Sequence, residues 1–208
     1  MIAIVDYRAG NLTSVRLAFE ALRAPAIVTR APDAIAGAAR VVFPGVGAAG
    51  AAMANLQVLG LAEPLREAAR RGTPFLGICL GAQALFDFLE EDGGVPGLGL
   101  LPGTVRKFAP ADRREKVPQI GWNAVHWQRP HPLCAGIESG SEFYFVHSYY
   151  IAPGRPEDTL GATDYAGVSF TAMAARGNLA AAQFHPEKSG RIGMQLLENF
   201  IHWTPHAD

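Results

Sequence analysis

The first half of the chain alternates short apolar runs with segments in which apolar residues recur at helical spacing. The runs at 2–6, 41–43 and 75–78 are bounded by polar or turn residues, so each predicts a buried strand. Between them, Asn11 is an expected N-cap for a helix of about three turns, and an alanine-rich helix breaks near Gly60 before the next helix. Strands that alternate with helices are typical of an α/β fold.

The pattern changes after residue 92, where glycine and proline interrupt the chain repeatedly between 93 and 103. The runs that follow have the composition of strands and predict antiparallel sheet, with an amphipathic helix to close the chain. No internal repeat, low-complexity linker or boundary separates the two halves, so we expect a single domain over residues 1–208. The expected strands are 119–127, 142–151, 169–174 and 179–184, and the expected helix is 191–203.

The amino-acid composition and charge exclude several classes of function. A hydrophobic share of 49% and a charged share of 18% provide a large core without a sign of disorder. The formal net charge of −1 gives no field to attract nucleic acid. The N-terminus lacks the basic start and apolar stretch of a signal peptide, and the uncharged window 41–62 is interrupted by Pro44 and glycines, so we expect a cytoplasmic protein with no membrane contact. Cys79 and Cys134 are expected to be free thiols.

The strongest chemical signal is the sequence Gly-Ile-Cys-Leu-Gly at 77–81, between an apolar strand and the helix-forming run 82–89. It is a nucleophile elbow with cysteine in the serine position. The glycines are needed because the tight turn from strand to helix leaves no room for side chains beside the strained central residue. A helix N-terminus stabilises a thiolate, so Cys79 is a candidate nucleophile; the alternative is a buried structural cysteine.

A base for this nucleophile is expected in the segment Gln-Phe-His-Pro-Glu at 183–187. Pro186 favours extended backbone at His185, and residues i and i+2 of an extended chain face the same way. Glu187 can therefore hold the His185 ring and stabilise its imidazolium form. Taken alone, the segment is also consistent with an ordinary histidine at a strand end.

The segment 45–50 matches the dinucleotide-binding pattern Gly-x-Gly-x-x-Gly between a strand and a helix. Three observations argue against that use. Pro44 stiffens the entry to the turn, the acidic residue required about 20 positions on is only the helical Glu67, and Cys79 and His185 would have no role. We expect instead a flexible loop whose backbone N–H completes an oxyanion hole.

The elbow and the His-Pro-Glu sequence at 185–187 together resemble the class I glutamine amidotransferases. The stretches 6–12, 117–123 and 145–150 are similar to the members of that family that supply a cyclase of histidine biosynthesis. The resemblance extends over the whole chain. It implies an α/β three-layer sandwich with a mixed, largely parallel central sheet flanked by helices.

The resemblance also implies roles for individual residues. Cys79 would be the nucleophile, His185 the general acid and base, and Glu187 the residue that orients His185. The remaining expected residues fall into three groups. The oxyanion hole would use Leu80, Val46 and Gly47, the last two after a rearrangement of the loop; glutamine would contact Gln83, Gly45, Ser148 and Tyr149; and a partner would contact Asn11, Trp122, Asn123 and Lys188.

The implied reaction is hydrolysis of glutamine to glutamate and ammonia through a cysteinyl thioester. The implied partner is a (β/α)8-barrel cyclase subunit, which in a heterodimer would use the ammonia to make imidazole glycerol phosphate and an aminoimidazole carboxamide ribotide. This chemistry needs no cofactor and no metal. His131 and Cys134 are spaced like two metal ligands, but nothing nearby in the sequence supplies a third.

Three other functions remain open from the sequence. The chain is consistent with a glutaminase of another pathway, of the pyridoxal phosphate synthase or anthranilate synthase type, with a nucleotide-binding module, and with a non-catalytic scaffold subunit. The sequence also departs from the family pattern at three positions. Arg8, Ala49 and Gln119 stand where the family commonly has glycine, phenylalanine and histidine.

Overall fold

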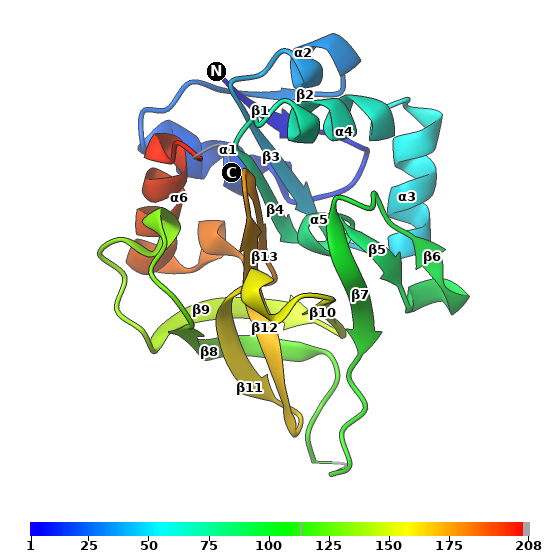
Figure 1. Cartoon of the computed structure of the whole chain (residues 1–208), viewed down its shortest axis with the longest axis vertical. Coiled ribbons are helices and arrows are strands. Elements are labelled where there is room, and N and C mark those ends of the chain that lie inside the picture. Colours follow the sequence, from blue (N-terminus) through cyan, green and yellow to red (C-terminus); the bar gives the residue numbers. More distant parts are fainter. Residues whose placement is uncertain (113, 206–208) are drawn as a thin grey trace.

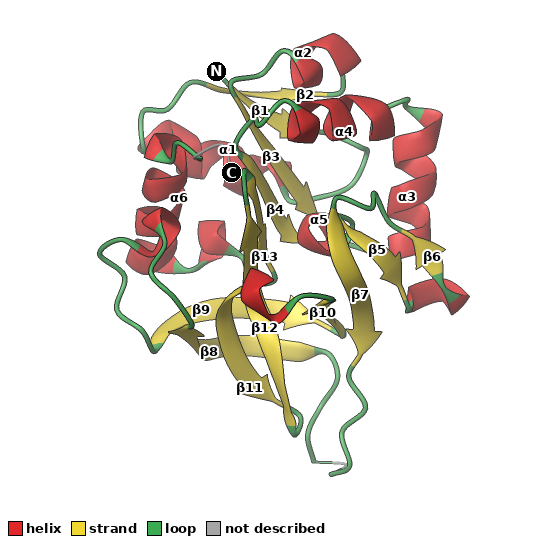
Figure 2. Cartoon of the chain, viewed as in Figure 1, coloured by secondary structure: helices red, strands yellow, loops and turns green. Residues whose placement is uncertain are grey.

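The computed structural model describes residues 1–112 and 114–205, in which one mixed sheet runs through the molecule between layers of helices (Figures 1 and 2). The parallel part of this sheet has five strands in the order β2-β1-β3-β4-β13. The strand bounds are Ile2–Val5 for β1, Ala26–Thr29 for β2, Arg40–Gly45 for β3, Phe75–Cys79 for β4 and Leu179–Ala182 for β13.

The sheet continues beyond β13 with antiparallel pairing through β12, β10 and β7, and it ends with β5 and β6. Three further strands, β8, β9 and β11, branch from β12 in the lower half of Figure 1. The bounds are Phe86–Leu89 for β5, Val95–Pro96 for β6, Leu101–Lys107 for β7, Gln119–Trp127 for β8, Ser141–His147 for β9, Tyr149–Pro153 for β10, Thr159–Tyr165 for β11 and Val168–Arg176 for β12.

Helices cover both faces of the parallel strands. Successive residues of each strand point to opposite sides of the sheet, so both faces carry apolar side chains that the helices bury. In β1, Ile4 belongs to the core under α1 and α6, whereas Val5 belongs to the core under α2, α3 and α4. The fold is therefore the expected α/β sandwich of three layers. The helix bounds are Leu12–Ala21 for α1, Pro32–Ala36 for α2, Ala49–Val58 for α3, Ala62–Arg70 for α4, Leu80–Gln83 for α5 and Gly190–His202 for α6.

The helix expected over 82–89 is wrong. Helix α5 ends at Gln83, and the chain then forms β5, which pairs with β6 and in parallel with β7. Phe86 and Leu89 are buried in the core on that side of the sheet, so long-range pairing overrides the local preference for helix.

Two further corrections concern the second half. The strand expected over 142–151 is divided at Ser148 into β9 and β10. The segment 179–184 was expected in antiparallel sheet, but β13 pairs antiparallel only with β12 and parallel with β4, so it joins the two parts of the sheet. Among the described residues, no helix has the length and apolar character needed to cross a membrane.

Candidate active site

Cys79 occupies the turn where β4 ends and α5 begins, with φ 55° and ψ −115°. Side chains rarely adopt this positive φ, so the backbone at Cys79 is strained as the elbow pattern predicts. A Cβ atom at Gly81 would lie 1.8 Å from the Phe43 carbonyl oxygen, and one at Gly77 would lie 2.7 Å from Cα of Ala82. Only glycine fits at either position, which explains both glycines of the motif.

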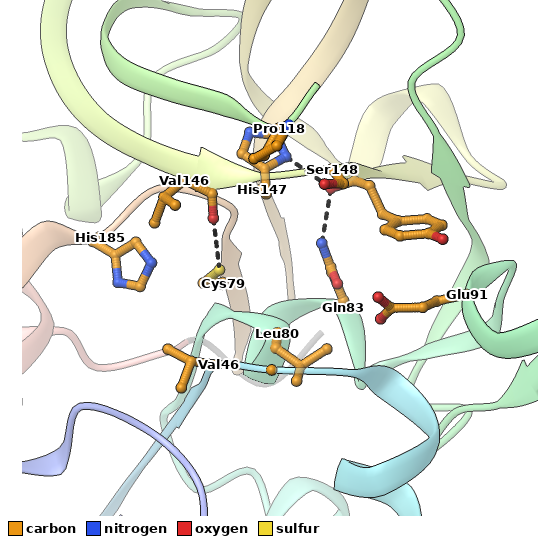
Figure 3. Close-up of a pocket in the computed structure, with 12 residues that line it drawn as sticks. Val46, Cys79, Leu80, Gln83, Glu91, Pro118, Val146, His147, Ser148 and His185 are labelled. Atoms are coloured by element: carbon orange, nitrogen blue, oxygen red, sulfur yellow. Dashed lines mark hydrogen bonds between the residues drawn. The ribbon is translucent and has the colours of Figure 1, made fainter. Parts of the chain in front are cut away.

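His185 follows β13, the strand next to β4, and its side chain faces Cys79 (Figure 3). Its backbone is extended, with φ −103° and ψ 95°, as Pro186 requires. The Nδ1 atom lies 2.8 Å from Oε1 of Glu187, and both side chains are buried. Because Glu187 occupies Nδ1, Nε2 is the ring nitrogen available to Cys79.

The main chain around His185 is also fixed. Its N–H donates to the Tyr144 carbonyl oxygen at 2.9 Å, and its carbonyl oxygen accepts from the Ser189 hydroxyl at 2.6 Å. These two bonds attach the loop after β13 to β9 and to the start of α6. The ring therefore has little freedom to leave the elbow.

The electrostatics of the site favour a charged His185. Burial alone lowers the pKa of a histidine, but here the neighbouring Cys79 and the hydrogen-bonded, charged Glu187 raise the pKa of His185 to about 10. The imidazolium form is therefore favoured at neutral pH. A histidine in this state can donate a proton to a leaving group.

His147, at the end of β9, faces the same cavity but has the opposite character. Burial, the main cause, and the nearby His185 together lower the pKa of His147 to about 4, although a hydrogen bond to the Tyr149 backbone acts in the opposite direction. Its Nδ1 lies 2.7 Å from the Tyr149 carbonyl oxygen, which can only accept, so Nδ1 carries the proton and Nε2 is unprotonated. Sequence reasoning missed this residue, because its burial among aromatic rings comes from tertiary packing.

The cavity between these elements has a volume of about 280 Å³, which suits a small polar molecule. Figure 3 shows that its wall combines the elbow, the loop after β3, the β9–β10 junction and one acidic side chain. The wall thus brings together the expected nucleophile, its expected base and the residues expected for the oxyanion hole. The lining residues are Val46, Gly47, Cys79, Leu80, Gln83, Glu91, Pro118, Val146, His147, Ser148, Tyr149 and His185.

Most of the expected glutamine-binding residues line this cavity, and one does not. Gln83 donates from Nε2 to the Tyr149 carbonyl oxygen at 2.8 Å and to Oε1 of Gln183 at 3.1 Å, so α5 is tied to β10. Ser148 and Tyr149 lie beside it in the lining. Gly45 is absent from the lining and packs behind it, against Gly81 and Tyr7.

Glu91 is a lining residue that the sequence did not indicate. It lies in the short 3₁₀ turn η1 (Glu91–Gly93), and its Oε2 accepts from the Ala49 N–H at 2.8 Å. The next residue, Asp92, accepts in the same way from the Gly50 N–H at 3.0 Å. These carboxylates cap the first turn of α3. They therefore fix the segment that follows residues 45–47, the loop expected to complete the oxyanion hole and called the oxyanion loop below, even though Ala49 replaces a larger side chain of the family pattern.

The loop itself is held less firmly than the elbow. Gly45 has no room for a Cβ atom, but Gly47 has φ +95° and nothing within 4 Å of the position of a Cβ. Val46, between them, is 40% exposed. The loop therefore combines one fixed glycine with a segment that has space to change its backbone orientation.

The residues expected at a partner surface lie on the outside of the molecule. Trp122 on β8 is 54% exposed, so it does not belong to the core. Its ring contacts Tyr144 edge-on, and Lys188 lies over the Tyr144 ring with Nζ 5.9 Å from the ring centre. Asn123 donates to the Asp164 carbonyl oxygen, and Asn11 is the N-cap of α1, accepting from the Ser14 N–H.

Two departures from the family pattern have clear structural settings. Arg8 is exposed and adopts φ 69°, a left-handed conformation that favours glycine. Its N–H donates to Oδ1 of Asp6 at 2.9 Å, which holds the turn. Gln119 is 3% exposed, and its Oε1 has no hydrogen-bond partner in the described part of the chain.

Both cysteines are free, and burial raises the pKa of Cys134 to about 12. Cys134 is therefore an unreactive thiol, in contrast to the cavity position of Cys79. Within residues 1–112 and 114–205, no group of three or more His, Cys, Asp or Glu side chains is arranged to hold a metal ion.

Comparisons with known proteins agree on one family. The family model described as "Glutamine amidotransferase class-I" matches residues 3–203. The imidazole glycerol phosphate synthase subunit HisH of Moorella thermoacetica is 52% identical over 206 residues, covering 99% of this chain and 96% of that protein. The protein of the same name from Nitrosomonas europaea is 49% identical over 212 residues, covering 98% and 99%.

Solved structures support the fold. A crystal structure of a glutamine amidotransferase has a TM-score of 0.74 and 17% sequence identity, covering 97% of each chain. The glutaminase domain of the Trypanosoma brucei protein CTPS, with bound acivicin, has a TM-score of 0.66 and 15% identity, covering 97% of this chain and 93% of that one. At these identities the likeness concerns the architecture alone.

Proposed function

The chain belongs to the glutamine amidotransferase class-I family, and we propose that it works as the glutaminase subunit of imidazole glycerol phosphate synthase in histidine biosynthesis. The observation that carries this proposal is that Cys79 and His185 line one small cavity and that Glu187 is hydrogen-bonded to His185. Relatives of that name are about half identical over nearly the whole chain. Glutamine is the substrate, and glutamate and ammonia are the products.

The reaction begins when the Cys79 thiolate attacks the carboxamide carbon of glutamine and forms a C–S bond. The tetrahedral intermediate then collapses, the C–N bond breaks, and the His185 imidazolium gives its Nε2 proton to the departing ammonia. Water next attacks the thioester while His185 takes its proton, which releases glutamate and regenerates the thiolate. Glu187, at 2.8 Å from Nδ1, orients the ring throughout.

The oxyanion of each tetrahedral intermediate needs hydrogen-bond donors beside Cys79. The Leu80 N–H, directly after the nucleophile, is one donor, and the loop with Val46 and Gly47 provides the second. Support for this assignment comes from the position of all three residues in the cavity wall. The space around Gly47 allows the loop to turn its peptide groups toward the substrate.

The substrate's polar ends have complementary groups in the cavity. The Glu91 carboxylate suits the α-ammonium of glutamine, and the backbone of Ser148 and Tyr149 suits its polar groups. Gln83 holds the Tyr149 carbonyl and so fixes this part of the wall. The chemistry calls on no cofactor.

A partner subunit follows from the fate of ammonia, which is mostly protonated and no longer nucleophilic in neutral water. We propose that the partner is a (β/α)8-barrel cyclase, bound as a heterodimer through the surface that contains Asn11, Trp122, Asn123 and Lys188. The exposure of Trp122, together with exposed Ile120 two residues before it on β8, supports this surface, because large apolar side chains are enriched in interfaces.

We also propose that residues 1–208 form one domain and that the protein works in the cytoplasm. The match of the family model to residues 3–203 and the single connected sheet support the first proposal. Two free cysteines support the second, since reducing compartments keep thiols unpaired.

The proposal is tested by measuring glutamate release from glutamine by the chain alone, and then with a cyclase subunit and its nucleotide ligand. We expect the partner and ligand to raise the rate about 10²- to 10³-fold, the range that one oxyanion donor supplies. Cys79→Ala should abolish the activity, whereas the matched control Cys134→Ala should retain it.

Two outcomes would contradict the proposal. A folded chain that hydrolyses glutamine without any response to the cyclase would belong to a glutaminase of another pathway. A complex that remains fully active after Cys79→Ala would exclude Cys79 as the nucleophile.

A further inference from the structure

Tyr7 lies two residues beyond β1 and is completely buried, yet its hydroxyl has no hydrogen-bond partner among the described residues. Its ring is fixed by an edge-on contact with Phe43, at 5.3 Å between ring centres. A buried hydroxyl without a partner is costly, and phenylalanine would fill the same space without that cost. The hydroxyl therefore requires an explanation beyond packing.

The position of the hydroxyl places it against the oxyanion loop. A Cβ atom at Gly45 would lie 2.6 Å from the Tyr7 oxygen and 2.5 Å from the Gly81 nitrogen. The oxygen is thus next to the point where β3 ends, between the loop and the elbow. Tyr7 is absent from the cavity lining, so it contacts the loop from behind.

The peptide group nearest this oxygen is the one that joins Gly45 to Val46. Burial and the nearby Cys79 raise the pKa of Tyr7, while the approaching Val46 N–H lowers it. The Val46 N–H thus lies close enough to the hydroxyl to influence it, although the two groups make no hydrogen bond.

We propose that Tyr7 is a positioning residue whose hydroxyl serves both orientations of the Gly45–Val46 peptide. In the present orientation the hydroxyl lies close to the Val46 N–H. When the peptide turns so that this N–H enters the cavity, the Gly45 carbonyl oxygen takes its place at Tyr7 and accepts a hydrogen bond from the hydroxyl. A tyrosine hydroxyl can do both because it is donor and acceptor at once.

This role rests on the proposed function, because it matters only if an oxyanion forms at Cys79. The turned Gly45 carbonyl would be enclosed by the elbow and by the Phe43 and Tyr7 rings, away from water. Without the hydroxyl it would be a buried acceptor with no partner. Loss of the hydroxyl should therefore lower the fraction of the protein in the active orientation.

The test is Tyr7→Phe, which keeps the ring and removes one oxygen, with Tyr150→Phe as the matched control outside the cavity. Glutaminase kcat and KM are measured in the complex with the cyclase subunit and its nucleotide ligand. Tyr7→Phe should lower kcat on the order of tenfold to a hundredfold. KM for glutamine should stay as in the parent, and Tyr150→Phe should change neither constant.

Two further measurements separate this role from a merely structural one. The rate at which iodoacetamide alkylates Cys79 depends on the thiolate and not on the oxyanion hole, so it should be the same in Tyr7→Phe and the parent. The Tm of the free chain should not fall, because the hydroxyl that is removed has no partner there. An unchanged kcat would overturn the proposal, and so would a lower kcat accompanied by slower alkylation or a lower Tm.

The same experiment distinguishes failure of the inference from failure of the proposed function. If the parent chain hydrolyses glutamine at a rate that the cyclase does not change, the proposed partner is contradicted. The ratio of kcat for the parent chain alone to kcat for Tyr7→Phe alone then still tests the role of Tyr7. A parent that alkylates normally and never hydrolyses glutamine overturns both.

Discussion

The elbow and the oxyanion loop form two walls of one cavity, and they are built in opposite ways. On the elbow side, added atoms at Gly77 and Gly81 would collide with backbone, and His185 and Glu187 are buried and hydrogen-bonded to each other. On the loop side, Gly47 is surrounded by open space and the Tyr7 hydroxyl lacks a partner among the described residues. The proposed nucleophile and its base are thus held in place in the free protein, whereas the loop proposed to stabilise the transition state has room to adjust.

The difference in rigidity between the walls is tested most directly by adding one methyl group to each. Gly81→Ala places a Cβ atom 1.8 Å from the Phe43 carbonyl, which belongs to backbone and cannot move aside. We expect it to lower the free energy of unfolding by about 4 kcal/mol or more. Gly47→Ala meets no atom and suffers only from its φ of +95°, so about 1–2 kcal/mol is expected.

Urea denaturation of both variants and the parent measures these losses. Equal losses for Gly81→Ala and Gly47→Ala would mean that the two walls are equally rigid, and the contrast between them would be wrong.

The two histidines of the cavity extend the contrast to the pH dependence of stability. The raised pKa of His185 contributes stability that is complete below the ordinary value of 6.5 and is lost as the pH rises through about 10. The depressed pKa of His147 acts on the other side: as the pH falls from 6.5 toward about 4, the unfolded chain takes up a proton that the folded chain does not. The free energy of unfolding should therefore decrease in both directions from about pH 6.5.

Two variants test which histidine causes the loss of stability on each side of pH 6.5. Cys79→Ala removes one partner of His185 and should flatten the alkaline loss, whereas His147→Gln should flatten the acid loss. Denaturation curves between pH 4 and 10 provide the measurement. If Cys79→Ala left the alkaline slope unchanged, the elbow would not be holding His185 in its charged form.

A more modest change in stability is expected at the turn beside the loop wall. Arg8 adopts φ 69°, where glycine has no steric cost, so Arg8→Gly should stabilise the chain by about 1 kcal/mol. The Asp6 carboxylate that receives the Arg8 N–H would keep this bond, because the donor is backbone. Thermal denaturation of the variant should show a higher Tm; a lower Tm would mean that the arginine side chain makes contacts that outweigh the strain.

Local sequence determines the elbow side of the site, and long-range packing determines the rest. The glycines around Cys79 and the i, i+2 spacing of His185 and Glu187 encode their geometry within a few residues, so the sequence predicted them. Glu91 and His147 reach the cavity only through the fold: no pattern marked Glu91, and His147 lies in the stretch 145–150 without a pattern that gave it a role. The roles of these residues in catalysis remain predictions.

The sequence predicted the fold with the same division between local pattern and long-range packing. The pattern of apolar runs predicted β1, β3 and β4 and the alternation of strands with helices, and the expected bounds of β8 agree with the structure. The largely parallel sheet flanked by helices was implied by the family resemblance. The pattern failed at 86–89, where pairing with β7 decides the conformation, and it gave no sign of β2 or β11. Burial of Tyr7 was equally invisible, because its contacts come from Phe43 and Gly45.

Strand β13 lies next to β4 in the sheet, between β4 and β12, although it begins about 100 residues later in the sequence, at Leu179. During synthesis, β4 and its cysteine are therefore made long before the strand that brings the histidine beside them. A nascent or prematurely terminated chain would therefore contain the proposed nucleophile without its proposed base. We expect such a fragment to be unable to hydrolyse glutamine, so that activity would require nearly complete translation.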